Sequence, residues 1–135
     1  MFPDPESSGR SGRSDGGRGE LGRLGEEIAA ERLASRGYRI IERNFRTREG
    51  EVDLIAWDGP VLVFVEVKSR RGRAYGLPEE SITPTKSERL IAVAYAYLQA
   101  MESPPEDWRI DAVAIEFGIG MTVRRFELIQ SAIES

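Results

Sequence analysis

The sequence predicts an α/β fold in which one mixed β-sheet is flanked by helices, in the order α-β-β-β-α-β-β. Five segments have the alternating or continuous apolar pattern of strands, and turn residues separate them. Two longer segments have apolar residues at helical spacing. A chain of 135 residues has the size of one domain, and its 40% of hydrophobic and 31% of charged residues are ordinary for a soluble globular protein.

The N-terminal segment, residues 1–20, is rich in glycine, serine and arginine and has almost no apolar residues. Such a segment buries too little apolar surface to offset the entropy of ordering, so we expect a disordered tail before a single domain over residues 21–135. The tail lacks the apolar stretch of a signal peptide. The longest apolar run, from Leu90 to Leu98, is too short to span a membrane. We therefore expect a soluble, cytoplasmic protein without membrane contact.

The first half of the domain predicts a helix and three strands. Apolar residues recur at helical spacing from Leu21, and Gly37 stands where a C-terminal cap is expected. The turn sequence Asp58-Gly59-Pro60 joins the second strand to the third. The three strands are predicted over residues 38–46, 51–57 and 61–68.

The second half predicts a loop, a helix and two strands. Residues 69–80 combine glycine, proline and several charges, which indicates a mobile loop. Thr83 followed by Pro84 is typical of a helix start. The helix should end near Met101, because Pro104-Pro105 prevents its continuation. The last two strands are predicted over residues 108–116 and 121–128.

The absence of cysteine and histidine from the sequence restricts the possible chemistry. Without cysteine there is no disulfide, thiolate nucleophile or cysteine-bearing zinc site. Without histidine the commonest general base and the usual ligand of softer metals are missing. A metal site built from carboxylates alone favours Mg²⁺ or Mn²⁺.

Four charged residues interrupt the apolar pattern of two neighbouring strands. Glu66 and Lys68 share one face of the third strand, and Glu51 and Asp53 share one face of the second. A connection of even length at Gly59-Pro60 would place Asp53 opposite Glu66 and Glu51 opposite Lys68, with Cβ atoms about 4.5–5.5 Å apart. Two carboxylates this close repel each other unless a cation lies between them. The pattern therefore predicts a divalent metal site.

Simpler interpretations of these residues remain open. Glu51 and Lys68 would also suit a plain cross-strand ion pair, and Asp53 or Glu66 a bond to a nearby arginine. Glu26 lies at the margin of the apolar stripe of the first helix. It is either a further metal ligand or an ordinary boundary residue.

Basic residues follow the third strand directly. Arg70, Arg71 and Arg73 would bind phosphate groups next to the predicted metal site, or form a solvated surface. Only Lys68 and Lys86 are lysines among 19 basic residues, and the two cation types are not interchangeable. Lys86, in the first turn of the second helix, is thus either a phosphate contact or an exposed residue.

Several short motifs lie between Gly22 and Asp111 with a characteristic spacing: Gly25-Glu26 with Ala29, Asn44, Gly50-Glu51-Val52-Asp53, Phe64-Val65-Glu66-Val67-Lys68, Gly76 and Lys86. By these motifs the chain resembles the YraN-like family of bacterial proteins. That family belongs to the restriction-endonuclease-like superfamily and is similar to archaeal Holliday-junction resolvases. The resemblance implies a restriction-endonuclease-like sheet and a metal-dependent endonuclease.

The resemblance also implies roles for individual residues. Asp53 and Glu66 would bind Mg²⁺ or Mn²⁺ with help from the Val67 carbonyl. Lys68 would position and activate the attacking water. Glu26 would match the acid of the first helix.

The remaining expectations concern substrate, assembly and alternatives. The resemblance implies DNA as the partner, with branched or recombining DNA favoured, and a homodimer like that of related resolvases. Glu51 has only an auxiliary place in the pattern, and Asp111 matches an acid for which we expect a structural role. Alternatives from other classes are a non-catalytic nucleic-acid-binding module on the same scaffold and a protein-interaction domain.

Overall fold

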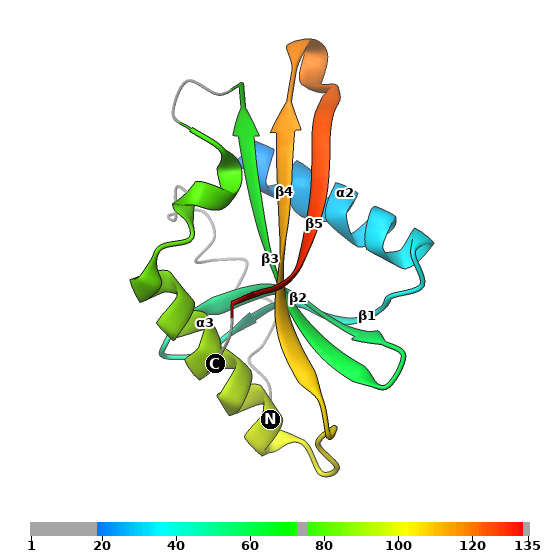
Figure 1. Ribbon diagram of the computed structural model, residues 1–135, viewed down its shortest axis with the longest axis vertical. Helices are drawn as coiled ribbons and strands as arrows, with labels where there is room; N and C mark the ends of the chain where they lie inside the picture. Colours follow the sequence, from blue (N-terminus) through cyan, green and yellow to red (C-terminus); the bar gives the residue numbers. More distant parts are fainter. Residues whose placement is uncertain (1–18, 73–75, 134–135) are drawn as a thin grey trace.

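A five-stranded sheet with an α-helix on each face makes up the part of the chain that the computed structural model describes, residues 19–72 and 76–133 (Figure 1). The order of helices and strands confirms the predicted α-β-β-β-α-β-β. The elements are α2 (Glu20–Ser35), β1 (Arg39–Arg46), β2 (Glu51–Asp58), β3 (Val61–Arg71), α3 (Pro84–Ala100), β4 (Trp108–Phe117) and β5 (Val123–Ile133), with short 3-10 helices η2 (Pro78–Ser81) and η3 (Ile119–Met121). The predicted tail falls outside the described residues except at its end, where α2 already begins at Glu20.

The strands follow one another across the sheet in chain order, β1-β2-β3-β4-β5. β3 and β4 are parallel, with α3 as the crossover between them, and the other three pairings are antiparallel. β2 and β3 pair from Asp58↔Val61 to Leu54↔Val65, which fixes a two-residue connection at Gly59-Pro60. This confirms the even-length connection on which the predicted site depends.

Three predicted boundaries were wrong: the start of the loop after the third strand, and both ends of the last strand. The loop predicted over residues 69–80 begins later, because β3 continues beside β4 as far as Arg71↔Phe117. Residues 73–75 of that loop lie outside the described residues. The last strand begins at Val123 instead of residue 121 and extends past Leu128 to Ile133. The extension holds because the Ser131 amide donates to the buried carboxylate of Asp111 at 2.9 Å.

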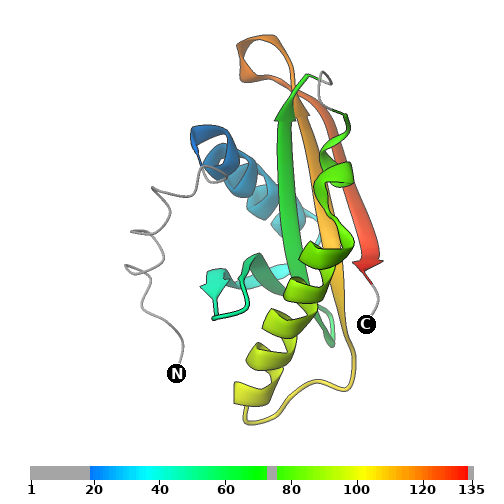
Figure 2. The same ribbon diagram turned by 90° about the vertical axis from the view of Figure 1, so that its left-hand side faces the viewer.

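Each face of the sheet has its own apolar core. α2 packs on the face that carries the valines of β3, through Ala29, Ala30 and Leu33. α3 packs on the opposite face, which carries Leu62 and Phe64 of β3. The two helices therefore cover opposite faces of the sheet, and Figure 2 shows α2 to one side of β3. β3 is therefore covered on both sides, as its continuous apolar run predicts.

α2 approaches β3 closely at Gly25. A Cβ atom at this position would lie 1.9 Å from Oγ of Ser69 and 3.2 Å from its Cβ. The helix ends in a Schellman motif, in which the Gly37 amide donates to the Ala34 carbonyl and the Tyr38 amide to the Leu33 carbonyl, both at 3.0 Å. Gly37 has φ +99°, as expected for the residue after such an end. Glycine thus sets both the height of α2 above the sheet and the point where it ends.

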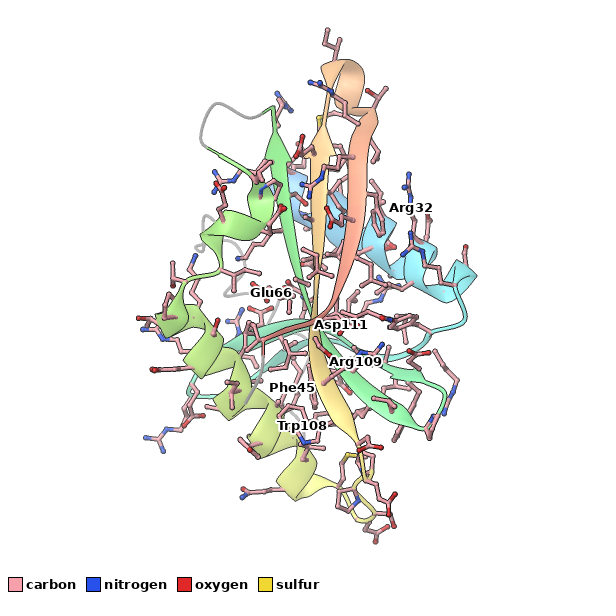
Figure 3. The ribbon with its side chains drawn as sticks, viewed as in Figure 1. Arg32, Phe45, Glu66, Trp108, Arg109 and Asp111 are labelled. Carbon is pink, nitrogen blue, oxygen red and sulfur yellow. The ribbon has the colours of Figure 1, made fainter. Side chains whose placement is uncertain are left out.

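A polar network around Asp111 ties the end of α2 to β4 and β5. The side chain of Asp111 is fully buried and accepts hydrogen bonds from the Tyr38 hydroxyl at 3.2 Å and from Nε of Arg109 at 2.9 Å. Arg109 also donates to Asp58 at 2.8 Å, at the end of β2. Burial alone would lower the pKa of the Arg109 guanidinium, but its bonds to the two carboxylates raise it overall. Figure 3 shows Arg109 and Asp111 together on β4, so the structural role expected for Asp111 fits its position.

Within the described residues, no helix is both long and apolar enough to cross a membrane.

Replacing Gly25 with alanine should lower the free energy of unfolding by about 1–3 kcal/mol, because the new Cβ overlaps Ser69 and forces α2 away from β3. Urea unfolding measures the loss. The double variant Gly25→Ala, Ser69→Gly removes both contacting atoms and should be more stable than Gly25→Ala alone. A Gly25→Ala protein as stable as the wild type would contradict the close approach.

Replacing Asp111 with alanine should lower the free energy of unfolding by about 3 kcal/mol, since Arg109 loses its buried partner and the Ser131 amide its acceptor. The matched control is Asp107→Ala, which removes an exposed acid just before β4 and should change stability by less than about 0.5 kcal/mol. Equal effects of the two substitutions would show that the network does not stabilise the fold.

Candidate metal-binding cleft

A cleft of about 620 Å³ lies where β2 and β3 separate, between the start of α2 and the start of α3. Most of the residues singled out in the sequence line it: Glu26, Glu51, Asp53, Glu66, Val67, Lys68, Arg70 and Lys86. They come from α2, β2, β3 and α3, so four elements meet here. Glu66 lies near the middle of the molecule, on the strand between the two helices (Figure 3).

Asp53 marks the point where β2 leaves β3. The paired residues end at Leu54↔Val65, one position after Asp53. Instead of continuing the ladder through its backbone, Asp53 accepts a hydrogen bond from the Val67 amide through Oδ2, at 2.7 Å. The residue is 8% exposed, so this bond fixes a largely buried carboxylate beside Glu66 and Val67. The bond also satisfies a backbone donor that the separating strands would otherwise leave without a partner.

Glu66 and Lys68 form an ion pair on β3. Nζ of Lys68 lies 2.9 Å from Oε2 of Glu66, and the two side chains are 26% and 13% exposed respectively. Residues two apart on a strand share a face, which brings these charges together. Lys68 thus pairs with Glu66, and Glu51 accepts from Arg46 at 2.8 Å, so both residues have partners other than those of the simple Glu51–Lys68 ion pair.

Glu26 reaches the cleft from the second turn of α2. Its Oε1 accepts a hydrogen bond from Nδ2 of Asn44 on β1, at 3.1 Å. The next residue, Glu27, points elsewhere and pairs with Arg43 at 3.2 Å. Of these two adjacent acids, only Glu26 lines the cleft.

The groups in the cleft suit a hard divalent cation. The carboxylates of Glu26, Asp53 and Glu66 and the backbone of Val67 supply oxygen donors, the ligands that Mg²⁺ and Mn²⁺ prefer. Across residues 19–72 and 76–133, no three acidic side chains already stand close enough to enclose an ion. Each carboxylate instead has a hydrogen-bond or ion-pair partner in the protein. A bound ion would share these carboxylates with their partners, because a carboxylate can accept more than one bond.

The predicted phosphate-binding residues separate into two groups. Arg70 of β3 and Lys86 of α3 line the cleft. Arg71 is not among the residues that line the cleft, and its Nη2 lies 3.0 Å from Sδ of Met121. Arg73 is outside the described residues. The positive charge of the described cleft thus comes from Lys68, Arg70 and Lys86.

Sequence reasoning missed the residues that hold the wall of the cleft. Ser81 lines the cleft from η2, and Arg125 of β5 fastens η2 to the sheet by donating to Glu79 at 2.7 and 3.0 Å and to the buried Glu116 at 3.0 Å. The hydrogen bonds that Arg125 donates to Glu79 are the main reason why the pKa of Arg125 is raised. Asn44 was noticed only as part of a motif, although an asparagine inside an apolar strand pattern is itself unusual.

Comparison with known proteins identifies relatives along most of the chain. Residues 25–115 match the family described as "Uncharacterised protein family UPF0102". A UPF0102 protein of Symbiobacterium thermophilum is 51% identical over 115 residues, which cover 85% of this chain and 97% of that protein. One of Anaeromyxobacter dehalogenans is 49% identical over 113 residues, or 84% of each chain. One of Chlorobium limicola is 50% identical over 95 residues, covering 70% of this chain and 74% of that protein.

Asp53→Ala should lower the free energy of unfolding by about 2 kcal/mol, because the Val67 amide loses its acceptor in a buried position. Asp53→Asn keeps an acceptor oxygen of the same shape and should lose less than about 1 kcal/mol. Urea unfolding of both variants separates the hydrogen bond from the charge. If the asparagine variant were as unstable as the alanine variant, the bond to Val67 would not be the reason for the loss.

Proposed function

This chain belongs to the uncharacterised protein family UPF0102, and we propose that it is a metal-dependent endonuclease that hydrolyses DNA phosphodiesters. The observation that carries the proposal is the convergence of Asp53, Glu66 and Lys68 in one cleft, joined by Glu26 from a different element. Neither a binding module nor an interaction domain needs two carboxylates beside a half-buried lysine. The family match supports the assignment to the YraN-like family, and the reaction type is taken from the resemblance of that family to restriction-endonuclease-like proteins.

Asp53, Glu66 and the Val67 carbonyl would hold Mg²⁺ or Mn²⁺, with Glu26 as a further ligand or as a support. When bound, the ion polarises the phosphate and lowers the pKa of coordinated water. Asp53 is the best fixed of these ligands, since its bond to the Val67 amide determines the direction of its carboxylate.

Lys68 has the geometry to serve the reacting phosphate. Its ammonium group is partly buried on the face of β3 that lines the cleft, so it would stabilise the negative charge that develops as water attacks phosphorus. Because Glu66 holds Nζ at 2.9 Å, the lysine is oriented before the substrate arrives. The same pair places the end of the Lys68 side chain beside a carboxylate, which favours a role in positioning water and stabilising charge.

Arg70 and Lys86 would bind phosphates on either side of the cut site. They line the cleft from β3 and from the first turn of α3, so a strand of DNA that crosses the cleft would meet both cations. Such contacts carry no sequence information, and a binding mode built on them suits recognition of DNA shape. This supports branched or recombining DNA, the substrate class implied by the resemblance to Holliday-junction resolvases.

The test is Mn²⁺-dependent cleavage of a labelled four-way DNA junction, alongside linear duplex and single-stranded DNA. Wild type should cut, and Asp53→Asn should lower the rate by about 100-fold or more, because the charge is lost while the fold is kept. Glu26→Gln should also lower the rate. The matched control is Glu27→Gln, which makes the same change one residue away on an exposed side chain and should cut like wild type.

Other outcomes point to the other function classes. Binding of these DNAs without cleavage, independent of metal and weakened by salt, would replace the endonuclease with a nucleic-acid-binding module. Neither binding nor cleavage would favour a protein-interaction domain. Equal loss of activity in Glu26→Gln and Glu27→Gln would remove Glu26 from the site.

A further inference from the structure

Asn44 has an unusual backbone conformation for a strand residue. Its φ is +52°, in the left-handed region, although it lies inside β1. Among the described residues, two other non-glycine residues share a positive φ: Met121 in η3, and Ser131 near the end of β5. Left-handed backbone is unfavourable for residues with a Cβ, and asparagine tolerates it better than most. Such strain persists where the surrounding structure or a function requires it.

The left-handed conformation changes which faces the side chains of β1 reach. In a regular strand, Arg43 and Phe45 would share a face and Asn44 would point to the other. Here Phe45 packs against Tyr97 of α3, with ring centroids 5.0 Å apart, whereas Arg43 and Asn44 both bond to α2 on the opposite face. Figure 3 shows Phe45 on the side of α3. The irregular backbone at Asn44 therefore lets two successive side chains contact two successive acids of α2.

Asn44 contacts Glu26, one of the residues that line the cleft. Its amide Nδ2 donates to Oε1 of Glu26 at 3.1 Å, in a partly buried position. Arg43 forms the parallel contact to Glu27, but that pair is half-exposed and outside the cleft. An aspartate at position 44 would tolerate the backbone but repel Glu26, and a glycine would relieve the backbone but leave no donor. Asparagine satisfies both requirements.

We propose that Asn44 is a positioning residue for Glu26, held in a strained conformation so that its amide orients the Glu26 carboxylate toward the metal in the cleft. The inference deepens the proposed function and rests on it. Partners that orient a metal ligand commonly change metal affinity by about 10–100-fold when they are removed. The strain at Asn44 should therefore cost the fold stability and contribute to metal binding.

The test measures Mn²⁺ affinity by titration calorimetry and stability by urea unfolding, with the full chain and no DNA. Asn44→Gly should be at least as stable as wild type, because glycine adopts this φ without strain, yet bind Mn²⁺ about 10-fold more weakly or worse. The Mn²⁺ affinity of Asn44→Asp should differ from that of wild type and of Asn44→Gly, since the new carboxylate repels Glu26. The matched control is Ser131→Gly, which relieves the same φ of +52° far from the cleft and should leave Mn²⁺ affinity unchanged.

A double-mutant cycle assigns the effect to Glu26. In a Glu26→Gln background, adding Asn44→Gly should produce little further loss of Mn²⁺ affinity, because the group that Asn44 orients is already changed. Wild-type affinity in Asn44→Gly, or a protein less stable than wild type, would overturn the inference and leave the proposed function standing. A wild-type protein that binds no Mn²⁺ would overturn both.

Discussion

The hydrogen bond from the Val67 amide to the Asp53 carboxylate is the contact around which the cleft is organised. β2 and β3 pair regularly as far as Leu54↔Val65 and then separate, which would expose backbone groups in the interior of a sheet. The Asp53 carboxylate accepts a hydrogen bond from the Val67 amide at the point where the pairing of the two strands ends. Glu26 from α2 and Lys86 from α3 line the space between the separated strands. The Asp53 side chain thus lies both at the end of the β2–β3 pairing and in the wall of the cleft.

The charges in the cleft are tolerated because each one has a partner. Glu66 has Lys68, Glu51 has Arg46, and Glu26 has the amide of an asparagine. Desolvating a carboxylate without such partners would be costly. The sheet also carries two separate apolar cores, one under each helix. These cores supply the hydrophobic stabilisation that the charged residues of the cleft do not. The proposed metal, when bound, would offset part of the cost of desolvating these carboxylates.

Much of this arrangement could be predicted, because local signals determine it. The two-residue turn at Gly59-Pro60 sets the register of β2 against β3, and strand periodicity then places Glu66 and Lys68 on one face. The end of β3 could not be predicted, since its polar residues become a strand only through pairing with β4, from a distant part of the sequence. The role of Asn44 was equally inaccessible, because it depends on a positive φ and on the position of α2 above the sheet.

The order of the strands has a consequence for how the molecule folds. Three of the four strand pairings join segments that follow each other directly in the chain, and only β3 and β4 are paired across an intervening helix. Contacts between segments close in sequence form with a small loss of chain entropy, whereas a parallel pairing must first close a long loop. The hairpin that carries Asp53, Glu66 and Lys68 is thus a local unit able to form early, and docking of α3 and β4 would be the slower event. Insertions in the connections after β3 would lengthen that closure without touching the geometry of the hairpin.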